Sequence, residues 1–151
     1  MTKESPMTKP ILTIVRGLPG SGKSTYARKL AAETGAMLIE PDSLLVRGGV
    51  YEYTPEAYND AVSFAIRMMM SASRCGADVV FADVLPTREN LAVWISSVRI
   101  HCLYTIRVID MPLLTVDESM ARNRHKVRRE DIERMAREWQ PWEGGTTNAS
   151  Y

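Results

Sequence analysis

The feature that most limits what this chain can fold into is the stretch GLPGSGKST at residues 17–25. A short apolar run, Ile11–Val15, precedes it, and a segment of helix-forming composition, Ser24–Thr34, follows it and stops at Gly35. A strand that passes through a glycine-rich turn into a helix gathers backbone N–H groups and the positive end of the helix dipole at one place. The stretch therefore predicts a phosphate-binding loop.

The loop satisfies the pattern G-x-x-x-x-G-K-[ST] at Gly17, Gly22, Lys23 and Ser24. In such a loop the lysine reaches the outer phosphates of a nucleotide, and the hydroxyl holds Mg²⁺. We therefore predict that Lys23 is catalytic and that Ser24 is a metal ligand. The loop residues predicted to contact the nucleotide are Gly17, Pro19, Gly20, Ser21, Gly22, Lys23, Ser24 and Thr25.

Strand-like and helix-like segments alternate along the rest of the chain. Apolar runs typical of strands lie at 36–40, 77–82 and 104–109, and helical patterns lie at 55–74, with Thr54 as its cap, 88–97, 113–123 and 129–139. This order predicts an α/β fold in which helices cover both faces of a parallel sheet. The length of 151 residues allows one domain. We expect a flexible leader at 1–10, the domain at 11–143 and a flexible tail at 144–151.

The composition narrows the setting in which the protein works. The chain is 45% hydrophobic and 25% charged, with a net charge of +1, which is the balance of a globular protein and not that of a strongly basic nucleic-acid binder. Its two cysteines form neither a spaced metal pair nor a disulfide framework. No stretch has the length of a transmembrane span. We therefore expect a cytoplasmic protein without membrane association, and the oligomeric state is left open.

Phosphate-binding loops serve motors, GTPases and kinases, and two observations separate these classes. A motor ATPase normally carries Asp-Glu at the end of an apolar strand, but here Asp83 is followed by Val84. The guanine-reading run Asn-Lys-x-Asp of GTPases is not found in the sequence. A small phosphotransferase is therefore the favoured class.

Such an enzyme needs a group that orients or deprotonates the acceptor hydroxyl beyond the carboxyl end of a neighbouring strand. Asp42 follows the apolar run at 36–40 directly after Pro41, so we predict it as this catalytic base. The alternative is a turn or cap carboxylate after the proline. Glu40 is a weaker candidate for the same task.

Two further carboxylates end predicted strands. Asp83 ends the third strand and is predicted as the magnesium carboxylate together with Ser24. Asp110 ends the fourth in a similar place, where a plain loop carboxylate is an equally good interpretation.

The run RNRHKVRR at 122–129 holds five basic side chains between two predicted helices. The transition state of phosphoryl transfer spreads negative charge over the equatorial oxygens, and a mobile lid can bring the positive charge that stabilises it. We predict a lid here, in which Arg122 and Arg124 contact the nucleotide and Arg122 and Lys126 act in catalysis. For each basic residue the alternative is a solvated side chain paired with Glu130, Asp131 or Glu133, and for His125 it is a surface position.

Several stretches together resemble the polynucleotide 5′-kinase-like P-loop kinases, among the AAA-type and zeta-toxin-related P-loop NTPases: ILTIVRGLPGSGKSTYA, EPD at 40–42, GGVYEYTPE at 48–56, FADVLPTRE at 81–89 and RNRHKVRREDIERMAREWQPWE at 122–143. The family includes the kinase domain of phage polynucleotide kinase and phage and bacterial relatives. The resemblance implies a four-stranded parallel sheet of order 2-3-1-4, ATP with Mg²⁺, and transfer to a 5′-hydroxyl. It also implies that Asp42 activates the acceptor and that Arg122 and Lys126 occupy the basic lid positions. If the gene is of phage origin, the protein would work in the cytoplasm of the host.

The sequence departs from this family where the acceptor would bind. Polynucleotide kinase has an arginine shortly after its activating aspartate, but the corresponding place here is apolar, at Leu44-Leu45, with Arg47 as a possible substitute. From the resemblance we expect a nucleic-acid 5′-hydroxyl as acceptor, and because of this departure a small metabolite, as in toxin-type kinases, stays an alternative, as does a non-catalytic ATP-binding module. Tyr51, Tyr53 and Tyr58 are expected either to stack on acceptor bases or to anchor their segment, while Trp139 and Trp142 are expected to fasten the last helix.

Overall fold

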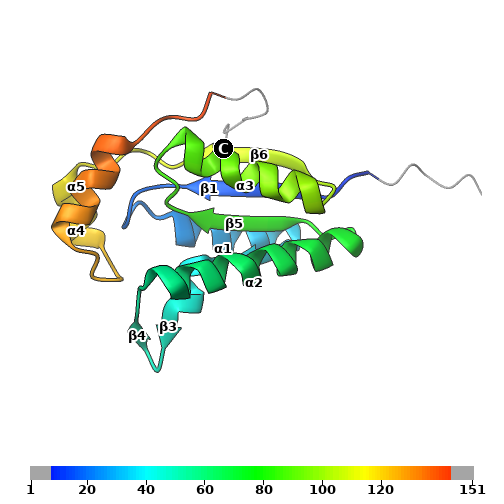
Figure 1. Ribbon diagram of the computed structural model, residues 1–151. Coiled ribbons are helices and arrows are strands. Elements are labelled where there is room, and N and C mark those ends of the chain that lie inside the picture. The colour runs from blue at the N-terminus through cyan, green and yellow to red at the C-terminus, as the bar shows by residue number, and fades with distance from the viewer. Residues whose placement is uncertain (1–7, 144–151) are drawn as a thin grey trace, which may run out of the picture.

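The computed structural model describes residues 8–143 and contains a four-stranded parallel sheet (Figure 1). Its strands are β1 (Ile11–Arg16), β2 (Met37–Ile39), β5 (Val79–Asp83) and β6 (Thr105–Asp110). They are ordered β2-β5-β1-β6, and every pairing is parallel. Counted along the chain, this is the order 2-3-1-4 implied by the family resemblance. All carboxyl ends therefore meet at one edge, which is where open parallel sheets bind ligands.

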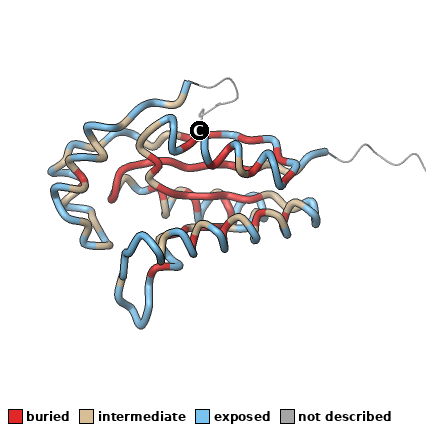
Figure 2. The backbone as a smooth tube through the Cα atoms, in the orientation of Figure 1, coloured by how far each residue is buried: buried red, intermediate tan, exposed pale blue. Residues whose placement is uncertain are grey.

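Helices cover both faces of the sheet, as predicted. The helix α1 (Lys23–Thr34) packs on one face, where buried residues of α1 and of the strands form a small cluster: Val15, Ala27, Ala31, Val80 and Ala82. The helices α2 (Pro55–Arg74) and α3 (Arg88–His101) pack on the other face and form the larger cluster with β1, β5 and β6. Figure 2 shows that the buried backbone is concentrated in these central strands. The result is a three-layer α/β/α arrangement.

Side chains along each strand alternate between the larger cluster and the cluster on the α1 side. Ile14 and Phe81 point into it from β1 and β5, while Val15 and Val80, their neighbours, point to the α1 side. The Phe81 ring lies against Trp94 of α3, with centroids 4.5 Å apart. Such aromatic pairs contribute roughly 0.5–1.5 kcal/mol beyond the area that they bury.

The helix boundaries follow from side-chain caps. Thr54 accepts a hydrogen bond from the backbone of Ala57 at 3.0 Å and caps α2, as the sequence predicts. The helix α3 continues to His101, beyond the predicted end at residue 97. The helix α4 (Val116–Arg122) starts later than the predicted residue 113, because Thr115 forms a capping box with Glu118. The last helix is α5 (Arg129–Glu138).

Two short elements between β2 and α2 were not predicted. A 3₁₀ helix, η1 (Pro41–Leu45), follows β2 and is succeeded by a small hairpin of β3 (Val46–Arg47) and β4 (Val50–Tyr51). Gly48 and Gly49 make the tight turn, with φ of 57° and 80°. Positive φ at both central residues is what a two-residue hairpin loop requires. The hairpin projects from the body beside the start of α2 (Figure 1).

The predicted leader and tail fall largely outside the described residues, which exclude 1–7 and 144–151. Pro10, at the predicted domain boundary, accepts a hydrogen bond from the backbone of Thr105 at 2.9 Å. No helix within residues 8–143 is long and apolar enough to cross a membrane.

Candidate functional site: a phosphate-binding loop at the carboxyl edge of the sheet

The loop between β1 and α1 depends on glycine for its geometry. Gly20 and Gly22 have φ of 77° and 85°, in the left-handed region that favours glycine. A Cβ atom at Gly20 would lie 2.7 Å from Cβ of Arg122, and one at Gly17 would collide with the hydroxyl of Ser21. The glycines therefore permit both the turn and the close approach of α4.

The loop provides a site for an anion. The first backbone N–H groups of α1 have no acceptor within the helix, and the helix dipole adds positive charge there. The hydroxyl of Ser21 is buried without a hydrogen-bond partner among the described residues. Ser24 is half-buried in the first turn, and Thr25 is exposed. These features fit the phosphates of a nucleotide.

Pro19, also predicted to contact the nucleotide, is engaged elsewhere through its carbonyl. That oxygen accepts a hydrogen bond from the buried Ser119 hydroxyl of α4 at 2.5 Å. Pro19 thereby joins the loop to the helix that leads into the basic run.

Lys23 is the first residue of α1 and is only 8% exposed. A cation at a helix N-terminus opposes the dipole, so this placement costs stability unless an anion compensates. Burial lowers the pKa of Lys23, while the nearby carboxylates of Asp42, Asp83 and Glu40 partly offset the effect. The ammonium group therefore lies near the acidic groups that follow β2 and β5.

Asp42 is presented by η1 immediately beyond the end of β2. Its Oδ1 accepts a hydrogen bond from the hydroxyl of Tyr51 at 3.2 Å. The side chain is half-buried, so it can still be approached from solvent. Glu40 has a side chain only 10% exposed, and its Oε2 lies 3.5 Å from Arg28 of α1. Glu40 is thus engaged with a basic side chain of α1, whereas Asp42 is bonded to Tyr51.

Asp83 ends β5 and is 5% exposed. Its Oδ2 accepts a hydrogen bond from the hydroxyl of Tyr58 at 2.8 Å, and its Oδ1 accepts one from the backbone of Val84, also at 2.8 Å. Burial, reinforced by the charge of Asp42, raises the pKa of Asp83 to about 6. Tyr51 and Tyr58 therefore hold the two acidic groups of the site, which supports the anchoring interpretation for these tyrosines.

The hydroxyl of Ser24 and the carboxylate of Asp83 are oxygen ligands of the kind that fits Mg²⁺ bound together with a nucleotide's phosphates. No group of three or more His, Cys, Asp or Glu residues within residues 8–143 could hold a metal ion alone. Mg²⁺ in phosphate sites is usually bound through one or two carboxylates and the substrate's phosphates, and it keeps several waters. A carboxylate at Asp83 and a hydroxyl at Ser24 would suffice for such a shared site.

The basic run divides into two groups. Arg128 pairs with Asp131 at 3.1 Å, and Arg129 pairs with Asp117 of α4 at 2.7 Å and with Glu133 at 3.1 Å. The alternative of surface pairing therefore holds for these two arginines. Arg122, Arg124 and Lys126 form no ion pair with any residue in the part of the chain that the structure describes, and all three are exposed.

The part of the chain that carries the loop, the carboxylates and the basic run matches a known family. A family model described as an AAA domain, AAA_33, matches residues 12–142, which is most of the chain. The chain belongs to this family. The sequence-based assignment to the P-loop kinases is thereby confirmed.

A curated relative resembles this AAA domain in sequence. It is a candidate bifunctional polynucleotide kinase/RNA ligase of Autographa californica nuclear polyhedrosis virus, 27% identical over 129 residues. The match covers 78% of this chain and 18% of the viral protein, so the chain spans less than a fifth of that relative.

Solved structures share the fold of this AAA domain. One is a chain of the Pnkp1/Rnl/Hen1 RNA repair complex, with a TM-score of 0.72 and 19% identity, where the match covers 86% of this chain and 44% of that one. Another is a sugar kinase from Janibacter sp. HTCC2649, with a TM-score of 0.67 and 16% identity, covering 91% and 82%. The chain therefore has the fold of these P-loop kinases.

One structural residue of the AAA domain was missed in the sequence. Arg16, the last residue of β1, is fully buried and donates hydrogen bonds to the carbonyl oxygens of Leu85 at 3.0 Å and Gln140 at 2.9 Å. It also pairs with Asp110 at 2.9 Å and lies 4.6 Å above the ring of Trp139. Nothing in the sequence distinguishes it from a polar residue at a strand end.

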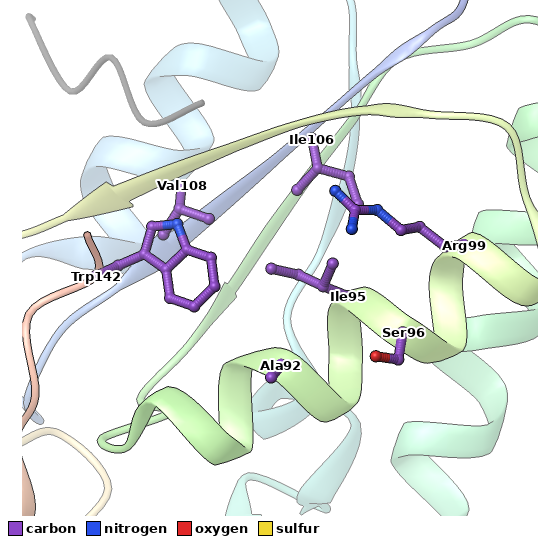
Figure 3. A pocket seen from close by; sticks show the side chains of 7 residues that line it. All are labelled: Ala92, Ile95, Ser96, Arg99, Ile106, Val108 and Trp142. Carbon is purple, nitrogen blue, oxygen red and sulfur yellow. The ribbon is translucent and has the colours of Figure 1, made fainter. Parts of the chain in front are cut away.

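Asp110 is therefore a structural carboxylate. Besides Arg16, it accepts a hydrogen bond from the backbone of Trp142 at 3.0 Å. Trp139 and Trp142 thus fasten the segment after α5 to the sheet, as expected from the sequence. The ring of Trp142 also lines a pocket of about 170 Å³ between α3 and β6, together with Ala92, Ile95, Ser96, Arg99, Ile106 and Val108 (Figure 3). None of the predicted site residues lines this pocket.

Proposed function

We propose that the protein is an ATP-dependent phosphotransferase that moves the γ-phosphate to a 5′-hydroxyl of a nucleic acid. The observation that carries the proposal is the electrostatic group of Lys23, Asp42 and Asp83 at the carboxyl edge of the sheet. It combines a phosphate-binding cation, a carboxylate suited to the acceptor and a carboxylate suited to the metal. A module that only bound ATP would have no need of the acceptor-side carboxylate.

In the proposed reaction the acceptor oxygen forms a bond to the γ-phosphorus. The bond from that phosphorus to the bridging oxygen breaks, and its electron pair leaves with ADP. The acceptor proton passes to the carboxylate of Asp42. Lys23 holds the outer phosphates, and Arg122, Arg124 and Lys126 would spread the developing negative charge as a lid at 122–129. Magnesium, held by Ser24, Asp83 and the phosphates, would neutralise charge on the phosphoryl oxygens.

A nucleic-acid acceptor is supported by the family resemblance and by the surface next to Asp42. Tyr53 and Val50 are 57% and 58% exposed there and offer flat or apolar area on which a base can stack. Arg47, in the same hairpin, is an exposed cation suited to a backbone phosphate. Arg47 and Val50 lie on the hairpin that follows the predicted base, and Tyr53 lies just after it.

We infer a cytoplasmic setting, because Cys75 and Cys102 are free thiols.

A small hydroxyl-bearing metabolite is the second candidate acceptor. Arg47 is the only basic residue between 40 and 54, while Leu44 and Val46 are 39% and 40% exposed in the same segment. A surface with so little positive charge would hold a polyanion weakly. The fold shared with a sugar kinase is compatible with this alternative.

A transfer screen with γ-labelled ATP separates these functions. The acceptors are 5′-hydroxyl DNA, 5′-hydroxyl RNA, nucleosides and sugars, each with Mg²⁺. The proposal expects label on the polymers, and it expects none on matched polymers that already carry a 5′-phosphate. Label on nucleosides or sugars alone would establish the second candidate. ATP binding without any transfer would indicate a non-catalytic module and overturn both.

A further inference from the structure

Tyr51 lies between two parts of the site that are far apart in the sequence. Its hydroxyl donates to Oδ1 of Asp42 at 3.2 Å. Its ring lies against the ring of His125, with centroids 4.7 Å apart and an interplanar angle of 31°. His125 stands in the basic run, between Arg124 and Lys126. One side chain thus contacts both the acceptor-side carboxylate and the segment that carries the unpaired cations.

We propose that Tyr51 is a positioning residue. It couples the orientation of the Asp42 carboxylate to the position of segment 123–128, whose His125 packs against the Tyr51 ring. The proposal rests on the phosphotransfer proposed above, because that reaction gives Asp42 its role as proton acceptor. Tyr51 touches neither the reacting atoms nor the nucleotide in this scheme. It acts through Asp42.

The hydroxyl of Tyr51 keeps its proton and so remains a hydrogen-bond donor to Asp42. Burial and the charge of Asp42 both raise the pKa of Tyr51 well above its ordinary value, so the phenol stays protonated at neutral pH. A hydrogen bond to Oδ1 restricts rotation of the carboxylate and leaves Oδ2 open to the acceptor. The acceptor proton then passes to Oδ2 as the acceptor oxygen bonds to the γ-phosphorus and the electron pair of the broken bond leaves with ADP.

Asp42 and Tyr51 belong to one small unit in which η1 and the hairpin are joined by hydrogen bonds. The backbone of Glu52 donates to the carbonyl of Leu45 at 2.9 Å, closing the hairpin onto η1. Within the hairpin Tyr51 is paired with Val46. A shift of this unit therefore carries the carboxylate and the phenol together.

The opposing segment is fixed at a second point. The side-chain amide of Asn123 donates to the carbonyl of Val127 at 2.8 Å, which draws the segment into a compact loop with Lys126 at a φ of 53°. The preceding helix is joined to the phosphate-binding loop through Ser119 and Pro19. When the basic residues are near the nucleotide, the contact between His125 and Tyr51 would thus hold the Asp42 carboxylate in the orientation that receives the acceptor proton. Without that contact, Asp42 would be less well oriented.

The test separates the hydroxyl from the rings. Tyr51→Phe removes the hydrogen bond and keeps the ring, His125→Ala removes the ring contact, and His125→Phe keeps a ring without its nitrogens. Tyr104→Phe is the matched control, since its hydroxyl donates to the carbonyl of Met69 at 2.8 Å, away from the predicted site residues. For each variant kcat, the KM of the acceptor and the Kd of ATP are measured, and thermal unfolding checks the fold.

We expect Tyr51→Phe to lower kcat about tenfold, because a hydrogen bond to a charged group is lost. The Kd of ATP should stay within about twofold, since Tyr51 makes no contact with the nucleotide in the proposed scheme. His125→Ala should lower kcat roughly three- to tenfold, and His125→Phe should restore most of that loss. The double variant Tyr51→Phe/His125→Ala should lose less than the product of the two single losses, because both act through Asp42. Tyr104→Phe should change stability and leave kcat unaltered.

Two results would overturn the coupling. One is an unchanged kcat in Tyr51→Phe. The other is a loss in His125→Phe as large as in His125→Ala, which would assign the imidazole to the substrate phosphates. The ratios are taken on whichever acceptor the wild type uses, so a wild type inactive on nucleic acids refutes the proposed acceptor alone. If no acceptor is used, ATP hydrolysis, with water as acceptor, supplies the ratio, and absence of hydrolysis as well refutes both proposals.

Discussion

Replacing Arg16 tests whether the guanidinium at the end of β1 holds the carboxyl edge together. Arg16→Met keeps the apolar length of the side chain and removes three hydrogen bonds of 3.0 Å or shorter, to Leu85, Gln140 and Asp110. Breaking a buried ion pair by removing one partner costs about 3–5 kcal/mol. The side chain of Asp110 is 25% exposed and can regain water, so the lower end of this range applies.

The assay is equilibrium unfolding in urea. With a slope of about 2 kcal/mol per molar, a loss of about 3 kcal/mol lowers the midpoint by roughly 1.5 M. Arg134→Met is the matched control: the side chain of Arg134 is 53% exposed and pairs with Asp131 and Glu138 on α5, so its loss should cost under about 1 kcal/mol. A cost for Arg16→Met equal to that of the control would refute the reasoning, since it would mean that the buried hydrogen bonds add nothing net.

Three further predictions concern the acidic groups and the loop lysine. Asp42→Asn should reduce transfer by about 10²–10⁴-fold and leave the Kd of ATP nearly unchanged, as a catalytic base does; near-normal turnover would remove Asp42 from the mechanism. Lys23→Ala should weaken ATP binding and transfer together, measured by calorimetry and by turnover, and a variant with normal values would argue against the phosphate-binding loop. For Asp83, a folded pKa of about 6 against an ordinary value of 3.8 means that its stabilising contribution is complete below about pH 4 and is lost as pH rises past 6. Asp83→Asn should abolish that loss, worth roughly 3 kcal/mol in the nucleotide-free protein, and an unaltered pH profile of urea midpoints would contradict the buried carboxylate.

The parallel sheet and the phosphate-binding loop were predictable from local pattern, whereas the strand order followed only from the family resemblance. Asp42 and Asp83 were predicted to lie at one edge because parallel strands bring their carboxyl ends together, and Lys23 experiences both charges in the structure. The contacts of Arg16 and Tyr51 were not predictable. Each depends on partners that only the tertiary fold brings near, since Arg16 reaches Gln140 and Tyr51 reaches His125.

The contacts of the basic run were predictable in part, because the spacing of its last arginines from the acids of α5 already indicated which side chains would pair. Arg128 and Arg129 stand three and four residues before Asp131 and Glu133, the spacings that bring side chains together on a helix. Arg122, Arg124 and Lys126 precede that helix, and although Glu130 stands four residues after Lys126, none of the three forms an ion pair within residues 8–143. The same sequence that pairs Arg128 and Arg129 with acids therefore leaves three cations unpaired, of which Arg122 lies against Gly20 of the phosphate-binding loop and the other two flank His125.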